Sequence, residues 1–187
     1  MNTSDALVAF FRRPGTRPMT APAHPSCRDA LPAQAGALDV AEVLAGQHRR
    51  IEALLGALLA AQTPAMRRQA VSALGDELLR HLSAEERVVY PAVRAARAPD
   101  VIAGSASAHR AITRSLAALR ALSVCDPQFE AACRDLRDEV AHHHAAQERE
   151  LLPALHLLID ATRREALGRD TLRACGAALH TSEPSAR

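Results

Sequence analysis

Two segments of this chain each place a histidine and a glutamate where both could bind one metal ion. The first holds His81 and Glu85, and the second, residues 142–153, holds three consecutive histidines and Glu148. Side chains four residues apart project from one face of an α-helix, so an imidazole and a carboxylate point the same way. Mixed imidazole and carboxylate ligation suits iron, manganese or zinc. The two segments therefore predict a transition-metal site.

Two further histidines, His48 and His109, each precede one of these segments. A lone helical histidine is more often a core or surface residue than a ligand, and one histidine–glutamate pair is usually a surface contact worth roughly a few tenths of a kcal/mol. Four such features on apolar helix faces are much harder to explain in that way, because an unpaired carboxylate is costly in an apolar core. A bound cation would offset that cost.

The spacing does not decide which histidine of the second segment is the ligand. Counting back from the proline as in the first segment selects His143, and Gln147 then occupies the position of Glu85. Counting four residues back from Glu148 selects His144 instead. We therefore predict Glu148 as the carboxylate and keep His143 and His144 as alternatives.

Other metal architectures fit the sequence less well. A ferritin-like di-iron bundle needs a glutamate three residues before a histidine on two helices, and only Glu139 and His142 form such a pair. A haem bundle needs only one or two axial ligands, and this chain offers more. We expect His142 at the surface or beside a ligand, and Glu86 as an alternative ligand or a hydrogen-bond acceptor.

Four stretches with apolar residues at steps of three and four predict four long helices to position these groups. Their starts are indicated by capping residues and prolines at Asp39, Thr63-Pro64, Pro99-Asp100 and Asp126-Pro127. The predicted core-facing residues are Leu44, His48, Ile51, Leu55 and Leu58; Leu74, Leu78, His81, Glu85, Val88 and Ala92; Ile102, Ser105, His109, Ile112, Leu116 and Leu119; and Phe129, Cys133, Leu136, Val140, Leu151 and Leu155. Short connectors imply an all-α, up-down-up-down antiparallel four-helix bundle.

We assign the bundle to residues 38–160. Five of the eleven prolines lie in residues 12–36, so residues 1–37 are predicted to be a disordered or loosely attached extension. Residues 161–187 are predicted to be a tail with at most one short helix, for which Leu167, Leu172 and Leu179 are available.

The composition argues against nucleic acid and membrane partners. The net charge is +2, aromatic residues make up 2% of the chain, and no basic block stands out among the arginines. No apolar run reaches the ~18 residues that cross a bilayer. Four cysteines, at positions 27, 125, 133 and 175, match no zinc or disulfide pattern. We expect a soluble cytoplasmic protein.

Taken together, these residues resemble the hemerythrin-like (HHE cation-binding) domain family. The matching elements are residues 47–51, 81–91, 108–112 and 142–153, which together span most of residues 38–160. The resemblance implies a four-helix bundle that holds a non-haem di-iron centre, in which an oxo or hydroxo group can bridge the two iron ions. The implied ligands are His48, His81, His109, one of His143 and His144, and the bridging carboxylates Glu85 and Glu148.

Two details of the resemblance bear on this site. Family members have an acid five residues after their helix-four histidine, which favours His143 with Glu148. Oxygen-carrying members have a second histidine one turn after the helix-three ligand, where this chain has Thr113. With one histidine fewer, an iron ion is more open to peroxide or nitric oxide than in a simple oxygen carrier.

The resemblance implies a protein that binds, senses or detoxifies oxygen, nitric oxide or peroxide, or handles iron under oxidative or nitrosative stress. We expect a metal- and small-ligand-binding protein more than a dedicated enzyme, and the sequence leaves enzymatic turnover open. The alternative is a regulatory or interaction bundle in which the metal only holds the helices together. In that case a protein partner or a homodimer is expected.

Overall fold

The structure is a computed structural model, and it describes residues 39–177. The extension predicted for residues 1–37 lies outside the described residues. Within residues 39–177 the chain is helical and contains no strand, which confirms the all-α prediction. No helix in this range combines the length and apolar character needed to cross a membrane.

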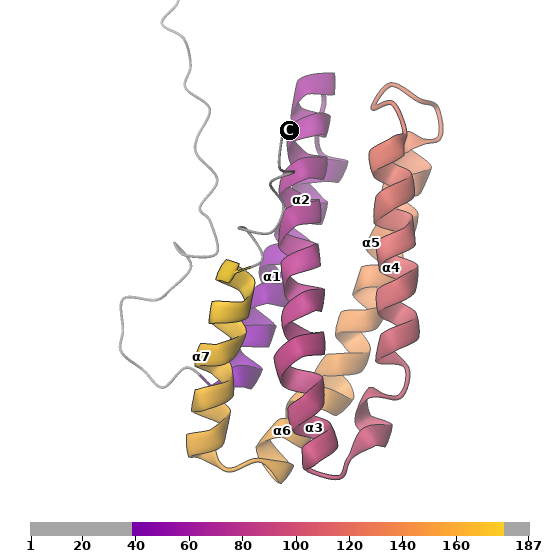
Figure 1. Ribbon diagram of the computed structural model, residues 1–187. Helices are drawn as coiled ribbons and strands as arrows, with labels where there is room; N and C mark the ends of the chain where they lie inside the picture. The colour runs from indigo at the N-terminus through magenta and orange to yellow at the C-terminus, as the bar shows by residue number, and fades with distance from the viewer. Residues whose placement is uncertain (1–38, 178–187) are drawn as a thin grey trace, which may run out of the picture.

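Five long helices lie side by side along one common direction (Figure 1). They are α1 (Val40–Leu59), α2 (Pro64–Ala84), α4 (Ser105–Ala121), α5 (Phe129–Ala146) and α7 (Ala161–Ala177). The shorter elements are α3 (Tyr90–Ala95), α6 (Leu152–Leu158) and the 3-10 helix η2 (Pro99–Ile102). Two π-helical segments, η1 (Glu85–Val89) and η3 (Gln147–Leu151), continue α2 into α3 and α5 into α6.

Capping fixes the starts of the first two helices. The side chain of Asp39 accepts a hydrogen bond from the backbone N–H of Ala41 at 2.9 Å. Thr63 accepts one from the N–H of Met66 at 3.2 Å, and Pro64 opens α2. Each bond satisfies a backbone donor that the helix itself cannot pair. Both starts were expected from the sequence.

The core consists of two apolar clusters separated by polar residues. On α1, Leu44 belongs to one cluster and Ile51 to the other, with the buried His48 between them. On α5 and η3, Val140 and Leu151 flank the histidines in the same way. The polar residues therefore form a layer between the packed helices, with an apolar cluster on each side of it.

Each π-helical segment precedes a proline, which gives a physical reason for it. Proline has no N–H to donate, and its ring clashes with the carbonyl four residues earlier. A wider turn avoids the clash: the N–H of Tyr90, just before Pro91, bonds to the carbonyl of Glu85 five residues earlier. The N–H of Leu152, just before Pro153, bonds in the same way to Gln147.

The core face predicted for the residues after Glu85 is wrong, because the wide turn of η1 rotates them. The sequence predicted Val88 and Ala92 as core residues, but both are only partly buried. Val89, Tyr90 and Val93 are buried instead. One extra residue in the turn rotates all that follows, so the regular helical period fails beyond Glu85.

The C-terminal helix is longer than the sequence predicted. α7 has 17 residues and packs against α1 and α2 on the outside of the other long helices (Figure 1). Its buried side chains are Leu167, Thr171 and Cys175, each four residues after the last. Two of these three are not strong hydrophobes, so the apolar pattern was weak. Arg164 also ties α7 to the start of α1, with Nε 2.6 Å from Asp39 Oδ2.

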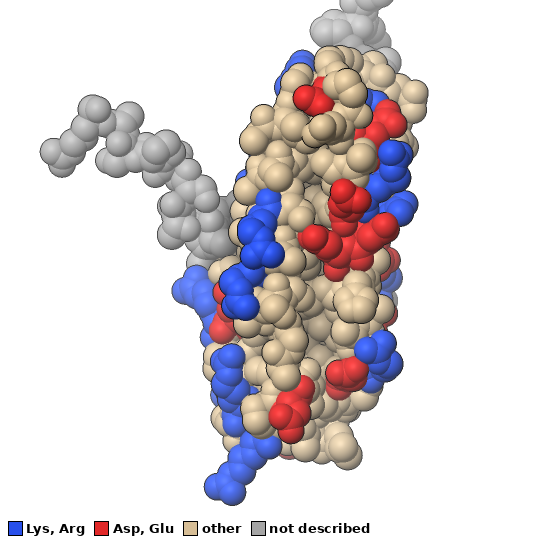
Figure 2. Space-filling view, turned by 90° about the vertical axis from the view of Figure 1, so that its right-hand side faces the viewer, with Lys and Arg blue, Asp and Glu red and all other residues tan. Residues whose placement is uncertain are grey.

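The surface that includes α4 and α5 carries both signs of charge. Figure 2 shows arginines and carboxylates in separate small groups among uncharged atoms, so neither sign covers this face.

Candidate metal centre

Seven side chains form the buried polar layer, and none is more than 4% exposed. We call them the polar layer: His48 of α1, His81 of α2, Glu85 of η1, His109 of α4, His143 and His144 of α5, and Gln147 of η3. All the residues predicted as ligands lie in this layer except Glu148.

Two groups of three side chains in the polar layer have the spacing of a metal site. One group is His48, His81 and His144, and the other is His81, Glu85 and His143. In each group the potential ligand atoms lie within 4.8 Å of one another. The sequence left His143 and His144 as alternatives, whereas in the structure both face inward, one in each group.

Glu85 is the centre of the polar contacts. Its Oε2 accepts a hydrogen bond from the hydroxyl of Tyr90 at 2.8 Å and lies 3.0 Å from Nε2 of His109. Its Oε1 accepts one from Nε2 of Gln147 at 2.7 Å. The Nε2 atoms of His81 and His143 lie 3.6 and 3.5 Å from its two oxygens. The two oxygens thus face different imidazoles, as a bridging carboxylate requires.

His109 is held between two carboxylates. Its Nδ1 lies 2.7 Å from Oε1 of Glu86, and its Nε2 faces Glu85. Burial opposes protonation, but the hydrogen bonds and charges of Glu85 and Glu86 outweigh it and raise the pKa of His109. Glu86 itself is 57% exposed, so it acts here as the hydrogen-bond acceptor that was one of its two predicted roles.

Glu148 lies at the edge of the polar layer. Its side chain is 51% exposed, and its Oε1 is 3.0 Å from Nδ1 of His48. Gln147 occupies the inner position instead, with Oε1 3.1 Å from Nε2 of His48. The residue that aligned with Glu85 when counted from the prolines therefore lines the layer, and Glu148 supports it from outside.

Three residues of the site were not assigned a role from the sequence. Gln147 was noted only as a mismatch to Glu85. Tyr90 carries the only phenol in the chain and follows Glu85 by five residues, a spacing that points inward only across a π-helical turn. Oε1 of Gln47 lies 2.9 Å from Nδ1 of His81, and the sequence singled out Gln47 only as part of the matching element 47–51.

The environment of the layer keeps two histidines neutral. Burial lowers the pKa of His81 to about 4, although Glu85 pulls it upward, and burial with neighbouring histidines lowers the pKa of His144 to about 2. Burial works against ionised Glu85, but the neighbouring imidazoles of His81, His109 and His143 hold the pKa of Glu85 well below its usual range. At neutral pH the layer thus offers imidazole lone pairs beside a carboxylate, which is the charge state that metal ligands need.

The residues present fit a metal ion because several buried imidazole nitrogens make no hydrogen bond to any residue that the structure describes. Within residues 39–177, no hydrogen-bond partner exists for Nε2 of His81, Nε2 of His143 or either ring nitrogen of His144. Leaving one such group unpaired costs about 1–3 kcal/mol. The rings of His48 and His144 also stack, with centroids 3.9 Å apart. A cation in the layer could take one lone pair from each imidazole that it contacts.

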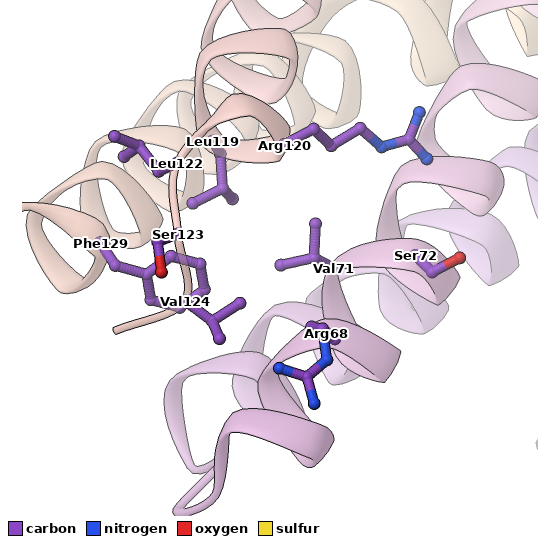
Figure 3. Close-up of a pocket in the computed structure, with 9 residues that line it drawn as sticks. All are labelled: Arg68, Val71, Ser72, Leu119, Arg120, Leu122, Ser123, Val124 and Phe129. Carbon is purple, nitrogen blue, oxygen red and sulfur yellow. The ribbon is translucent and has the colours of Figure 1, made fainter. Parts of the chain in front are cut away.

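A surface hollow of about 410 Å³ lies elsewhere, between α2 and the connection from α4 to α5 (Figure 3). Its lining residues are Arg68, Val71, Ser72, Leu119, Arg120, Leu122, Ser123, Val124 and Phe129. None of them belongs to the polar layer, so the hollow and the layer are separate features.

One comparison with known proteins finds a match. The family model described as "Hemerythrin HHE cation binding domain" matches residues 39–155, well over half of the chain. These residues include the whole polar layer and end before α7. No curated protein and no solved structure matches the chain significantly.

Proposed function

Because this chain belongs to the hemerythrin HHE cation-binding domain family, we propose that it is a non-haem di-iron protein. It binds, senses or detoxifies oxygen, nitric oxide or peroxide, or handles iron under oxidative or nitrosative stress, in the cytoplasm. The single observation that carries this proposal is the set of buried imidazole nitrogens without hydrogen-bond partners around one buried carboxylate. We further propose that α1, α2 with α3, α4, and α5 with α6 form the up-down-up-down bundle expected from the sequence.

The proposed iron ligands are His48, His81, His109, His143, His144 and Glu85. Iron bound there would supply electrons and an open coordination position to a small oxidant. Nδ1 of His81 is engaged by Gln47, so only its Nε2 is available, and His81 can bind one ion. Glu85, whose two oxygens face different imidazoles, would be the residue shared between two ions.

Other residues of the chain position these ligands. The hydroxyl of Tyr90 donates a hydrogen bond to Oε2 of Glu85. Burial and the charge of Glu85 raise the pKa of Tyr90, so the phenol stays protonated. Glu148 lies 3.0 Å from Nδ1 of His48 and fixes the direction of the ring, and a metal ion that binds Nε2 of His48 would displace its contact with Oε1 of Gln147. We propose this orienting role for Glu148 in place of the bridging one that the resemblance implied.

Burial limits what the centre can bind. With at most 4% of each side chain exposed, the polar layer admits a diatomic molecule or peroxide through small movements of the helices. A larger organic substrate would need the helices to separate. This favours ligands of two or three heavy atoms.

Iron counting in matched variants tests the ligand assignment. The anaerobically purified wild-type protein is expected to hold about two irons per chain. Glu85→Gln should lose at least one of them, whereas Glu148→Gln should keep both and bind iron roughly 10- to 100-fold more weakly, as when an orienting partner of a ligand is lost. His142→Ala is the control, since His142 is exposed next to His143. Equal iron contents in wild type and Glu85→Gln, with both folded, would overturn the assignment.

A further inference from the structure

The terminal helix α7 makes a polar contact that reaches the polar layer. Nε2 of Gln47, on α1, donates a hydrogen bond to Sγ of Cys175, on α7, at 3.2 Å. The other end of the same amide, Oε1, is 2.9 Å from Nδ1 of His81. Gln47, His81 and Cys175 are all at most 6% exposed. A continuous buried path therefore runs from the thiol through one amide to the imidazole.

The chemistry of these groups gives the path a direction. An amide nitrogen only donates and an amide oxygen only accepts, whereas a thiol can do both. The thiol of Cys175 donates weakly toward the carbonyl oxygen of Arg80, 3.9 Å away, which leaves its sulfur to accept from Gln47. The amide oxygen then faces His81, so Nδ1 of His81 must carry the proton. Its Nε2 holds the lone pair, lies 3.6 Å from Glu85 and has no hydrogen-bond partner.

The opposite orientation of the amide would disable this histidine. With its NH₂ group turned toward His81, Gln47 would donate to Nδ1, and the ring proton would move to Nε2. That proton would point into the polar layer, where a metal ion needs the lone pair. Because the thiol proton of Cys175 is directed to the carbonyl of Arg80, its sulfur accepts from Gln47, and this contact favours the observed orientation of the amide.

We propose that Cys175 is a positioning residue that acts through Gln47 to hold His81 in the form with Nδ1 protonated and Nε2 free. α7 is then part of the metal centre, although the family match ends before it at residue 155. This inference rests on the proposed function only in taking His81 as a ligand. In this inference the sulfur of Cys175 acts as a hydrogen-bond acceptor, whereas a buried cysteine usually serves as a small hydrophobe.

Cys133 provides the matched control. It is also buried, at 2% exposure, but it lies in the apolar cluster formed with residues such as Leu136 and Val140. Cys133→Ala and Cys175→Ala remove the same atom from buried sites on two helices. Cys175→Ser keeps a group that can accept from Gln47, and Gln47→Leu removes the amide. Far-ultraviolet circular dichroism shows whether each variant is folded.

The first measurement uses the metal-free protein. Nitrogen-15 NMR of the histidine rings, assigned with a His81→Gln variant, distinguishes a protonated Nδ1 from a protonated Nε2. Wild type, Cys133→Ala and Cys175→Ser are expected to show His81 with Nδ1 protonated. Cys175→Ala and Gln47→Leu should show Nε2 protonation or a mixture. An unchanged His81 in Cys175→Ala overturns the inference.

The second measurement is ferrous iron affinity by competition with a chelator. Cys175→Ala should bind iron about tenfold more weakly than wild type, and Cys175→Ser should recover most of the loss. Equal affinities in Cys175→Ala and Cys133→Ala would contradict the inference. If wild type binds no iron, the proposed function fails, while the NMR result on metal-free protein still decides the role of Cys175.

Discussion

At the scale of single residues, this chain buries imidazole nitrogens without hydrogen bonds, which the cores of helical proteins usually avoid. His144 has both ring nitrogens buried without a hydrogen-bond partner in the described part of the chain, and burial lowers its pKa to about 2. It lies within a group of three imidazoles whose ligand atoms are all within 4.8 Å of one another. Burying these nitrogens without hydrogen bonds costs stability. We explain the histidine by a metal ion, which an apolar side chain at position 144 could not bind.

Replacing this histidine should separate stability from metal binding. We predict that His144→Leu raises the free energy of unfolding of the metal-free protein by about 1–3 kcal/mol, because it removes unsatisfied polar atoms. The same variant should lose the stabilisation that iron gives to wild type. Urea unfolding with and without ferrous iron measures both effects. A metal-free variant less stable than wild type would show that His144 has a structural role instead.

Acid should destabilise the metal-free protein in a defined window. The unfolded chain protonates His81 and His144 near pH 6.5, whereas their folded pKa values are about 4 and about 2. Between pH 6.5 and 4.5 the unfolded chain therefore binds more protons, and stability falls as the pH falls, by up to about 1.4 kcal/mol per pH unit for each histidine. Glu85, with its lowered pKa, adds to the loss only below pH 4.5.

The raised pKa of His109 has the opposite effect on folding stability, which it lowers as the pH rises. Its stabilisation is complete below pH 6.5 and is lost as the pH rises through the folded value. Urea unfolding between pH 4.5 and 6.5 checks the main slope, and His144→Leu should reduce it by about half. A flat profile in this window would mean that the two histidines are not buried as neutral groups.

At the scale of elements, the two π-helical segments determine which residues reach the centre. Regular periodicity placed His48, His81, Glu85 and His109 on core-facing stripes, and the structure buries all four. Beyond Glu85 the period broke at η1, so Tyr90 was missed. In the second segment the sequence favoured Glu148, but Gln147 is buried. A π-helical turn adds a residue that hydrophobic spacing alone does not reveal, although the two prolines marked both places.

The contact of α7 with the residues around the polar layer could not be predicted from the sequence, for a different reason. The contact between Gln47 and Cys175 joins residues 128 apart in the sequence, and neither residue type is specific for a metal site. The buried face of α7 also carries Thr171 and Cys175 in place of larger apolar residues. Only the packing of α7 against α1 and α2 identifies this face.

Removing the proline after η1 should test its role. We predict that Pro91→Ala lets the regular helix continue, because alanine restores the N–H and is about 3 kcal/mol more favourable inside a helix. Tyr90 would then rotate away from Glu85, and iron affinity should fall about tenfold or more, while helicity is kept. Chelator competition and circular dichroism measure the two effects. Pro99→Ala, at the start of η2, is the control and should bind iron like wild type.

At the scale of the whole molecule, the polar layer divides the core into two apolar clusters. Metal-free protein must keep the clusters aligned across a layer that contributes unsatisfied nitrogens and a buried carboxylate. A metal ion that binds four helices at this level would join the two halves. The molecule is therefore expected to be markedly more stable with metal than without it.

Thermal unfolding should show this coupling directly. Free ferrous iron at 100 times its dissociation constant would add about 2.7 kcal/mol to the free energy of unfolding. We predict a clear rise in Tm for wild type under anaerobic conditions and little change for His81→Ala. The same Tm for wild type with and without iron, at saturating concentration, would contradict the idea that the layer is a binding site.

The most direct test of the central claim is a crystal structure of the anaerobically purified protein with anomalous data collected at the iron edge. We predict two anomalous peaks inside the polar layer, about 3.5–4 Å apart. Glu85 should lie between them, and His48, His81, His109, His143 and His144 should surround them. An ordered polar layer without any peak, in protein that was supplied with iron, would contradict the assignment of this layer as a di-iron centre.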